Sequence, residues 1–222
     1  MFMGAQTFPD KDSFNIVAEI KGTEKVDEIV MIGGHIDSWD ICQGAMDDGG
    51  AVAISWEVLS ILTQLQLKPK RTLRAVFFTG EESNFGGAIA YYNAHKNEAA
   101  NYSIMFESDS GTFTPTGIRF TDSEKAKAIL ELIGGTYWKN LKGIGASRVF
   151  NSASISDIED SQSLNVPTGS LSNVYEGERY FWYHRSPPDN MSIQDPDDMD
   201  LCTVVWAIYA FILADMNDKL PR

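Results

Sequence analysis

The chain has 222 residues, of which 43% are hydrophobic and 22% charged, and its formal net charge is −13. This composition indicates an ordinary folded protein with a sizeable core, and the acidic balance argues against nucleic-acid binding, which needs a surplus of Lys and Arg. No apolar run approaches the roughly 20 residues of a membrane-spanning helix, and the first residues show no secretory signal. Neither a membrane nor a nucleic acid is therefore expected as a partner.

Strand and helix patterns alternate along most of the chain. Strands are predicted where apolar residues alternate with polar ones or form short continuous runs. These segments are residues 13–22, 28–34, 71–80, 101–109 and 165–174. Helices are predicted where apolar residues recur every three or four positions. These segments are residues 50–66, 86–99, 123–139 and 196–216, with Ser123 as a cap and Pro196 in the first turn of the last helix.

Strands separated by helices of this length predict an α/β fold, with a mostly parallel mixed sheet and helices on both faces. The chain has no internal repeat or linker that would mark a second domain. In sheets of this kind, ligands bind beyond the carboxyl ends of the strands. Polar residues that follow the predicted strands are therefore expected to meet at one edge of the sheet.

Acidic residues and one histidine follow the predicted strands in four short motifs. They are His35 and Asp37 in GGHIDSWD, Asp47 and Asp48 in GAMDDGG, Glu81 and Glu82 in FFTGEESN, and Asp109 in FESDSG. A bridged pair of zinc ions needs about five protein ligands of these types and a further carboxylate as base. Asp37 is a candidate acceptor for the second ring proton of a metal-bound His35.

Each motif also has a simpler explanation when it is taken alone. A lone histidine is more often structural, and an Asp-Asp-Gly-Gly run is typical of a turn. Acidic residues after a strand favour the first turn of a helix, and Asp109 precedes a glycine as many turn residues do. Four such motifs at successive strand ends nevertheless favour a metal site.

The motifs GGHIDSWD, QGAMDDGG, GEES and ESDSGT, with their intervening lengths, resemble the family of co-catalytic zinc aminopeptidases and carboxypeptidases. The similarity extends over essentially the whole chain, including KPKRTLRAVFFTGEE and the closing VVWAIYAFILADM. It implies the zinc-exopeptidase form of the phosphorylase/hydrolase-like α/β fold. It also implies two zinc ions per chain and a hydroxide between them that attacks dipeptides or short peptides.

The resemblance also implies a role for each motif residue. His35 would bind one zinc, Asp47 would bridge both, and Glu82 would bind the zinc opposite to the one held by Asp109. Glu81 would be the general base. The Asp47–Asp48 peptide bond is expected to be cis.

The last ligand of the family is a histidine in a motif that continues with Ser or Thr, two variable residues and Asp. Here the segment is YHRSPPDN, so Arg185 occupies the motif position four residues before Asp189, and His184 comes one residue early. Arginine is a poor metal ligand because it stays cationic. Either the loop shifts so that His184 coordinates, or one zinc binds weakly or not at all, which leaves one metal per chain.

A second hypothesis, from a different class, is a catalytically impaired binding protein that keeps the peptidase fold. Arg185 motivates it, since a guanidinium can clamp a carboxylate instead of supporting a metal. The segment FNSASISDIEDSQS, residues 150–163, motivates it too. Relatives have a Gly-rich loop with an acidic residue and a Trp in this place, and only Asp157 matches.

The resemblance further implies a peptide substrate, a homodimer and a secreted or lysosomal location. It presents residues 1–222 as one catalytic domain that is incomplete at its N-terminus and lacks an inserted lid-like domain. Two glycosylation triplets begin at Asn101 and Asn190. Cys42 and Cys202 are too few for a disulfide framework, so one bridge or two free thiols are both open.

Overall fold

A computed structural model describes residue 4 and residues 6–137, 145–153, 155–174 and 178–222. The strands in this part of the chain are β1 (Ile16–Ile20), β2 (Lys25–His35), β3 (Arg71–Phe78), β4 (Tyr102–Glu107), β5 (Pro115–Thr121), β6 (Arg148–Asn151) and β7 (Thr168–Asn173). The α-helices are α1 (Gly50–Gln64), α2 (Gly86–His95), α3 (Glu124–Tyr137), α4 (Glu159–Ser163), α5 (Arg179–Tyr183) and α6 (Pro196–Asp215). Three short helical turns add to these: η1 (Ala45–Gly49), η2 (Lys96–Asn101) and η3 (Met191–Ile193).

The strands form one sheet in the order β1-β3-β2-β4-β7-β5-β6. The pairs β2–β3, β2–β4, β4–β7 and β5–β6 are parallel, whereas β1–β3 and β5–β7 are antiparallel. This confirms the predicted mostly parallel mixed sheet. The strands β5 and β6 were not predicted. β5 begins with a proline and a glycine before Ile118 and Phe120, which weakens the strand signal, and β6 has only four residues.

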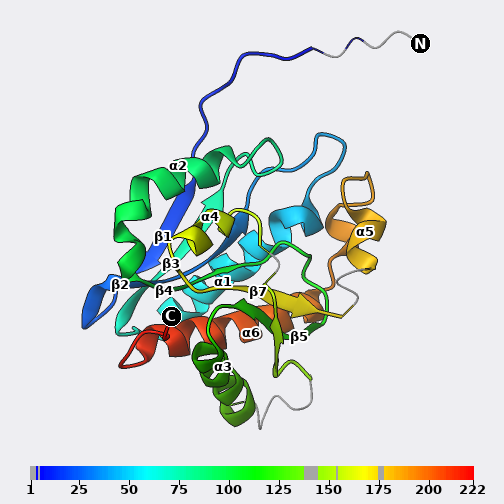
Figure 1. Cartoon of the computed structure of the whole chain (residues 1–222). Coiled ribbons are helices and arrows are strands. Elements are labelled where there is room, and N and C mark those ends of the chain that lie inside the picture. The colour runs from blue at the N-terminus through cyan, green and yellow to red at the C-terminus, as the bar shows by residue number, and fades with distance from the viewer. Residues whose placement is uncertain (1–3, 5, 138–144, 154, 175–177) are drawn as a thin grey trace.

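Helices cover both faces of the sheet, as predicted (Figure 1). On one face, α1, α3 and α6 pack on Val30, Leu73 and other strand residues, and buried Trp206 of α6 donates to the hydroxyl of Ser55 in α1. On the other face, α2 and α4 cover a second apolar cluster that includes Met31. Val30 and Met31 belong to different clusters because successive strand side chains point to opposite faces.

The C-terminal helix α6 is the buried helix that the sequence predicts. Asp195 caps it by accepting from the amides of Asp197 and Asp198, and Pro196 occupies the first turn. Ser123 caps α3 in the same way, through the amide of Ala126 at 3.2 Å. None of the helices in the described residues has the length and apolarity that crossing a membrane requires.

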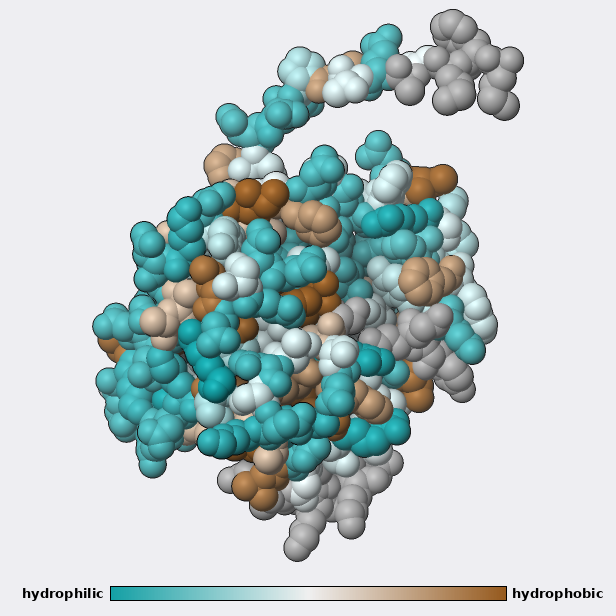
Figure 2. Space-filling view, viewed as in Figure 1, coloured by the Kyte–Doolittle hydropathy of each residue, from teal (hydrophilic) through white to brown (hydrophobic). Residues whose placement is uncertain are grey.

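The face seen in Figure 2 is mostly hydrophilic, with hydrophobic residues in separate small groups. This matches the net charge of −13. Cys42 and Cys202 are both free thiols, and Cys202 is a buried core residue of α6. The alternative with two free thiols is therefore the one that the structure adopts.

The sheet brings the strand-end motifs together at one edge. The neighbouring parallel strands β2, β3 and β4 end at His35, Phe78 and Glu107. The loops that leave these ends carry Asp37, the Glu81–Glu82 pair and Asp109, so the spacing of the motifs in the sequence becomes proximity in space.

Candidate metal centre

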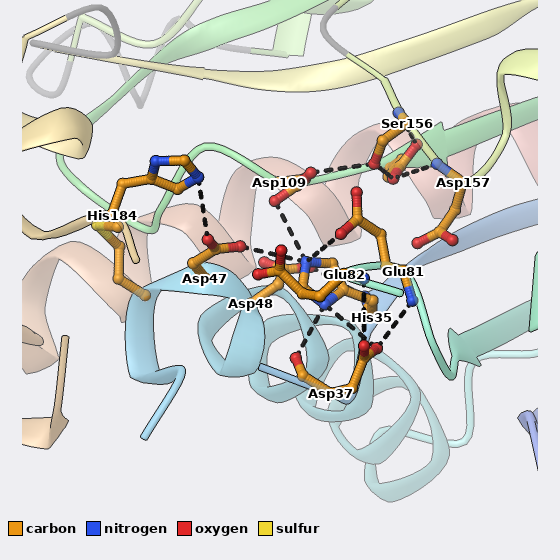
Figure 3. Close-up of polar contacts among 12 residues, drawn as sticks. His35, Asp37, Asp47, Asp48, Glu81, Glu82, Asp109, Ser156, Asp157 and His184 are labelled. Carbon is orange, nitrogen blue, oxygen red and sulfur yellow. Dashed lines mark hydrogen bonds and ion pairs between the residues drawn. The ribbon is translucent and has the colours of Figure 1, made fainter. Parts of the chain in front are cut away.

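His35, the last residue of β2, is the centre of the site and is fully buried. Its Nδ1 lies 3.0 Å from the carbonyl oxygen of Asp37, and because a carbonyl can only accept, Nδ1 carries the proton. The other ring nitrogen, Nε2, faces three carboxylates. It lies 3.2 Å from Asp47 Oδ1, 3.5 Å from Asp109 Oδ1 and 3.9 Å from Glu81 Oε2 (Figure 3).

These carboxylates make the surroundings of Nε2 strongly favourable for a cation. Burial alone lowers the pKa of His35, but the carboxylates of Asp109, Asp37 and Asp47 outweigh burial and raise it. A neutral Nε2 would direct its lone pair at carboxylate oxygens. The pocket therefore favours a positive charge at this nitrogen, either a proton or a metal ion that replaces the proton.

Asp47 lies between the two histidines of the site. Its Oδ1 faces His35, and its Oδ2 lies 3.4 Å from Nε2 of His184. Asp189 fixes the backbone here, since its buried carboxylate accepts from the amides of Met46 at 2.7 Å and Asp47 at 3.2 Å. The Asp47–Asp48 peptide bond is cis, as the resemblance implies.

Asp48 holds the end of β2 in place. Its Oδ2 accepts from the amide of His35 at 3.1 Å, and burial raises the pKa of this carboxyl group well above its usual value. A side chain at Gly34 would begin 2.1 Å from that oxygen, which leaves room only for glycine. This contact accounts for the glycine directly before His35.

Asp37 orients both glutamates of the next loop. Its carboxylate accepts from the amides of Glu81 and Glu82, at 3.1 and 3.2 Å. The sequence predicts Asp37 as the acceptor for His35, and its carbonyl takes that role at 3.0 Å while its carboxylate stays 3.7 Å from the ring. Burial, with Asp109 and Glu82 nearby, raises the pKa of Glu81 to about 7.

Several atoms at the centre are buried without a hydrogen bond. Within the described residues these include His35 Nε2, Glu82 Oε1 and Asp109 Oδ1. Two sets of three donors each lie within 4.8 Å of one another, His35 with Asp47 and Glu82, and His35 with Glu81 and Asp109. An imidazole and carboxylate oxygens that converge and lack partners fit a divalent metal such as zinc.

The loop after α5 presents His184, and not Arg185, to Asp47. Arg185 has a φ of 53°, a left-handed conformation that costs a non-glycine residue about 1 kcal/mol or more. Its guanidinium lies over the ring of Trp39 and binds Glu82 Oε2 at 3.0 Å. The indole of Trp39 donates to the same oxygen. Arg185 therefore holds one oxygen of Glu82 and leaves Oε1 directed inward.

The segment around Asp157 lies beside the centre. Burial, and next the charge of Glu107, raise the pKa of Asp157 to about 9, and neither carboxyl oxygen has a hydrogen-bond partner among the described residues. No role is predicted from the sequence for Glu107, Ser156 or Asp189. Glu107 stands inside the FESDSG motif and Asp189 closes the last motif, so position was the available signal for both.

Comparison with known proteins assigns the family. The model of peptidase family M28 matches residues 15–210. The chain belongs to this family. Carboxypeptidase Q of Rattus norvegicus is 47% identical over 221 residues, which are 99% of this chain and 45% of that protein. The predicted resemblance to the zinc aminopeptidases and carboxypeptidases is thus confirmed.

Two further relatives extend this result. A crystal structure of a peptidase M28 precursor from Shewanella amazonensis SB2B superposes with a TM-score of 0.85 at 32% identity, and covers 95% of this chain and 46% of that one. A "Probable zinc metalloprotease" of Pyrenophora tritici-repentis is 34% identical over 120 residues, 47% of this chain and 27% of that protein. The chain spans about half the length of the curated carboxypeptidase Q relatives.

Proposed function

We propose that this chain is a zinc-dependent exopeptidase that hydrolyses dipeptides or short peptides, of the carboxypeptidase or dipeptidase type. The observation that carries the proposal is the position of Asp47 between His35 and His184, with unpartnered ligand atoms around it. A carboxylate whose two oxygens face two different histidines is suited to bridge two metal ions.

The proposed ligand sets combine these contacts with the roles that the family resemblance implies. His35 and Asp109 would hold one zinc, Glu82 and His184 would hold the other, and Asp47 would bind both. When bound, zinc polarises the peptide carbonyl and activates water as a nucleophile.

Glu81 is proposed as the general base. It lies beside His35 at the edge of the ligand cluster, and a carboxyl pKa of about 7 suits a group that takes a proton from water near neutral pH. The same carboxyl group can then return the proton to the leaving amine. The contacts from Asp37 to the two glutamate amides keep Glu81 in position during both transfers.

The test is direct. The purified chain is loaded with zinc, its metal content is measured, and hydrolysis of an unblocked dipeptide is followed by amino-acid release. We expect close to two zinc ions per chain and activity that a chelator removes. Protein that stays inactive after zinc addition, although folded, would contradict the proposal.

A second candidate function is a peptide-binding protein without catalytic activity. The ion pair between Arg185 and Glu82 favours it, because the guanidinium already neutralises a carboxylate that the second zinc needs. Arg185→His discriminates the two. A large gain of zinc content or activity would show that the natural chain is impaired, and no change in either would count against impairment.

We also propose a secreted or lysosomal location, self-association and glycosylation at Asn190. Of the two triplets, the one at Asn101 has its Ser103 buried and bound by the amide of Leu220, whereas Ser192 of the other is exposed. Loss of an endoglycosidase-sensitive mass in Asn190→Gln would support the modification, and light scattering measures self-association. That residues 1–222 belong to one catalytic domain stays a prediction.

A further inference from the structure

We propose that Glu107 is a positioning residue that fixes the metal-facing orientation of Asp109 through Ser156, and so sets the affinity of the metal position next to His35. This rests on the proposed function, because Asp109 is a proposed zinc ligand. No role is assigned to Glu107 from the sequence, although it stands inside the FESDSG motif.

Glu107 is the last residue of β4 and is fully buried. Its carboxylate accepts four hydrogen bonds from one short segment. Ser156 donates its amide to Oε2 at 2.9 Å and its hydroxyl to Oε1 at 2.7 Å. The amides of Asp157 and Ile158 donate at 3.0 and 3.3 Å.

A buried carboxylate is expensive unless hydrogen bonds replace its water shell. Three consecutive amides and a hydroxyl provide that replacement here, so the segment 156–158 takes its shape from Glu107. The donors are 49 to 51 residues away in the sequence. Glu107 is therefore a long-range anchor for this segment and not a local turn residue.

The hydroxyl of Ser156 connects this anchor to the metal centre. Its oxygen lies 3.0 Å from Asp109 Oδ2 (Figure 3). It also lies 2.7 Å from Glu107 Oε1, so the single hydroxyl proton forms a bifurcated hydrogen bond that the two carboxylates share. The other oxygen of Asp109, Oδ1, has no hydrogen-bond partner in the described part of the chain and faces His35. Holding one oxygen of Asp109 leaves the second one directed at the metal position.

Contacts that orient a metal ligand typically contribute about 10–100-fold to metal affinity. Ser156→Ala removes the direct contact with Asp109, and we expect zinc affinity to fall about 10-fold or more. Glu107→Gln replaces one carboxylate oxygen with an NH2 group, which cannot accept a hydrogen bond. That group would face the backbone amides of residues 156–158, so this segment can no longer keep its position against residue 107. We expect a zinc affinity loss of about 10–100-fold. The double variant should lose little more than Glu107→Gln alone, because both act on one contact.

The experiment measures the zinc dissociation constant by competition with a chromophoric chelator and the melting temperature of the metal-free protein. Ser156→Thr keeps the hydroxyl and should restore affinity. Ser163→Ala, whose hydroxyl donates to the carbonyl of Asp160 in the same region, is the matched control and should bind zinc normally. A purely structural role would lower the melting temperature and leave the zinc affinity of the folded protein unchanged.

Folded Glu107→Gln and Ser156→Ala proteins with the affinity of the unmodified chain would overturn the proposal. If Glu107→Gln does not fold, the zinc affinities of Ser156→Ala and Ser156→Thr test the proposal, since both substitutions are small. An unmodified chain that binds no zinc at all would instead refute the proposed function, so the two failures are distinguishable.

Discussion

The two sides of the candidate metal centre are built in different ways. The strand-end side consists of His35, Glu82 and Asp109, which lie at or just after the ends of β2, β3 and β4, and the loop side consists of His184 and Arg185, which follow α5. Asp47, in η1, lies between the two sides. His35 is fully buried, its amide donates to Asp48 Oδ2, and its Nδ1 donates to the carbonyl oxygen of Asp37. On the loop side, the His184 side chain is 21% exposed and that of Arg185 47% exposed.

This difference shows which part of the metal centre is rigid. It also shows which part depends on whether His184 or Arg185 faces Asp47. Packing of parallel strands fixes the strand-end side before any metal binds. The loop side depends on the left-handed conformation of Arg185, which directs His184 inward. Substitutions on the two sides should therefore have unequal effects.

The largest effect is expected from His35→Ala on the strand-end side. Even residues that only support a ligand contribute about 10–100-fold to affinity or activity, so loss of the central ligand should reduce peptide hydrolysis by more than about 100-fold. Metal analysis should show the zinc content falling together with the activity. Retained zinc content and activity would contradict the placement of His35.

Glu81→Gln should separate chemistry from metal binding. Removing a general base costs about 10²–10⁴-fold in turnover, while the zinc content stays unchanged because other residues supply the ligands. Steady-state kinetics and metal analysis of the same sample check both points. If zinc is lost as well, Glu81 is a ligand, as its place in the second donor set allows.

On the loop side, His184→Ala should have a smaller effect than His35→Ala. We expect one zinc per chain to remain and turnover to fall by about 10–100-fold, the scale of a supporting contact. Arg185→Ala serves as the comparison, since Arg185 contacts Glu82 and not Asp47. Equal zinc content in His184→Ala and the unmodified chain would remove His184 from the ligand set.

The smallest expected effect is the pH dependence of the stability of the metal-free protein. Glu81 and Asp157 have pKa values of about 7 and about 9 in the folded protein, above those of the unfolded chain. The folded state therefore binds more protons, and the free energy of unfolding of the metal-free protein should fall as pH rises from about 5 to about 9. Thermal unfolding with chelator present measures this trend.

The control for the pH effect is Asp157→Asn. The net charge of −13 gives a trend of the same sign, so the variant is needed to assign part of the slope to Asp157. We expect a flatter dependence in the variant. A melting temperature that rises with pH in the metal-free protein would contradict the raised pKa values.

The sequence predicted the strand-end side well, and the reasons are physical. A continuous apolar run ending in glycines gives β2, and Gly34 is required by the contact with Asp48 that positions His35. Parallel strands then bring their carboxyl ends together whatever the loops do. The family resemblance added roles to residues whose positions were already fixed by the sheet.

The rest depended on contacts that no local pattern encodes. The strand β6 has only four residues, and the segment 156–158 is shaped by Glu107, which is far away in the sequence. Whether His184 or Arg185 faces Asp47 depends on the left-handed backbone conformation of Arg185. A motif predicts which residue type is expected at a position, but not which neighbour the loop turns inward.

Anomalous scattering at the zinc edge from crystals of the zinc-loaded chain tests the central claim most directly. The account predicts two peaks on either side of Asp47, one beside His35 and Asp109 and the other about 2.0–2.1 Å from His184 Nε2. A single peak at the strand-end side, with Arg185 still bound to Glu82, would contradict the two-metal assignment and favour the impaired alternative.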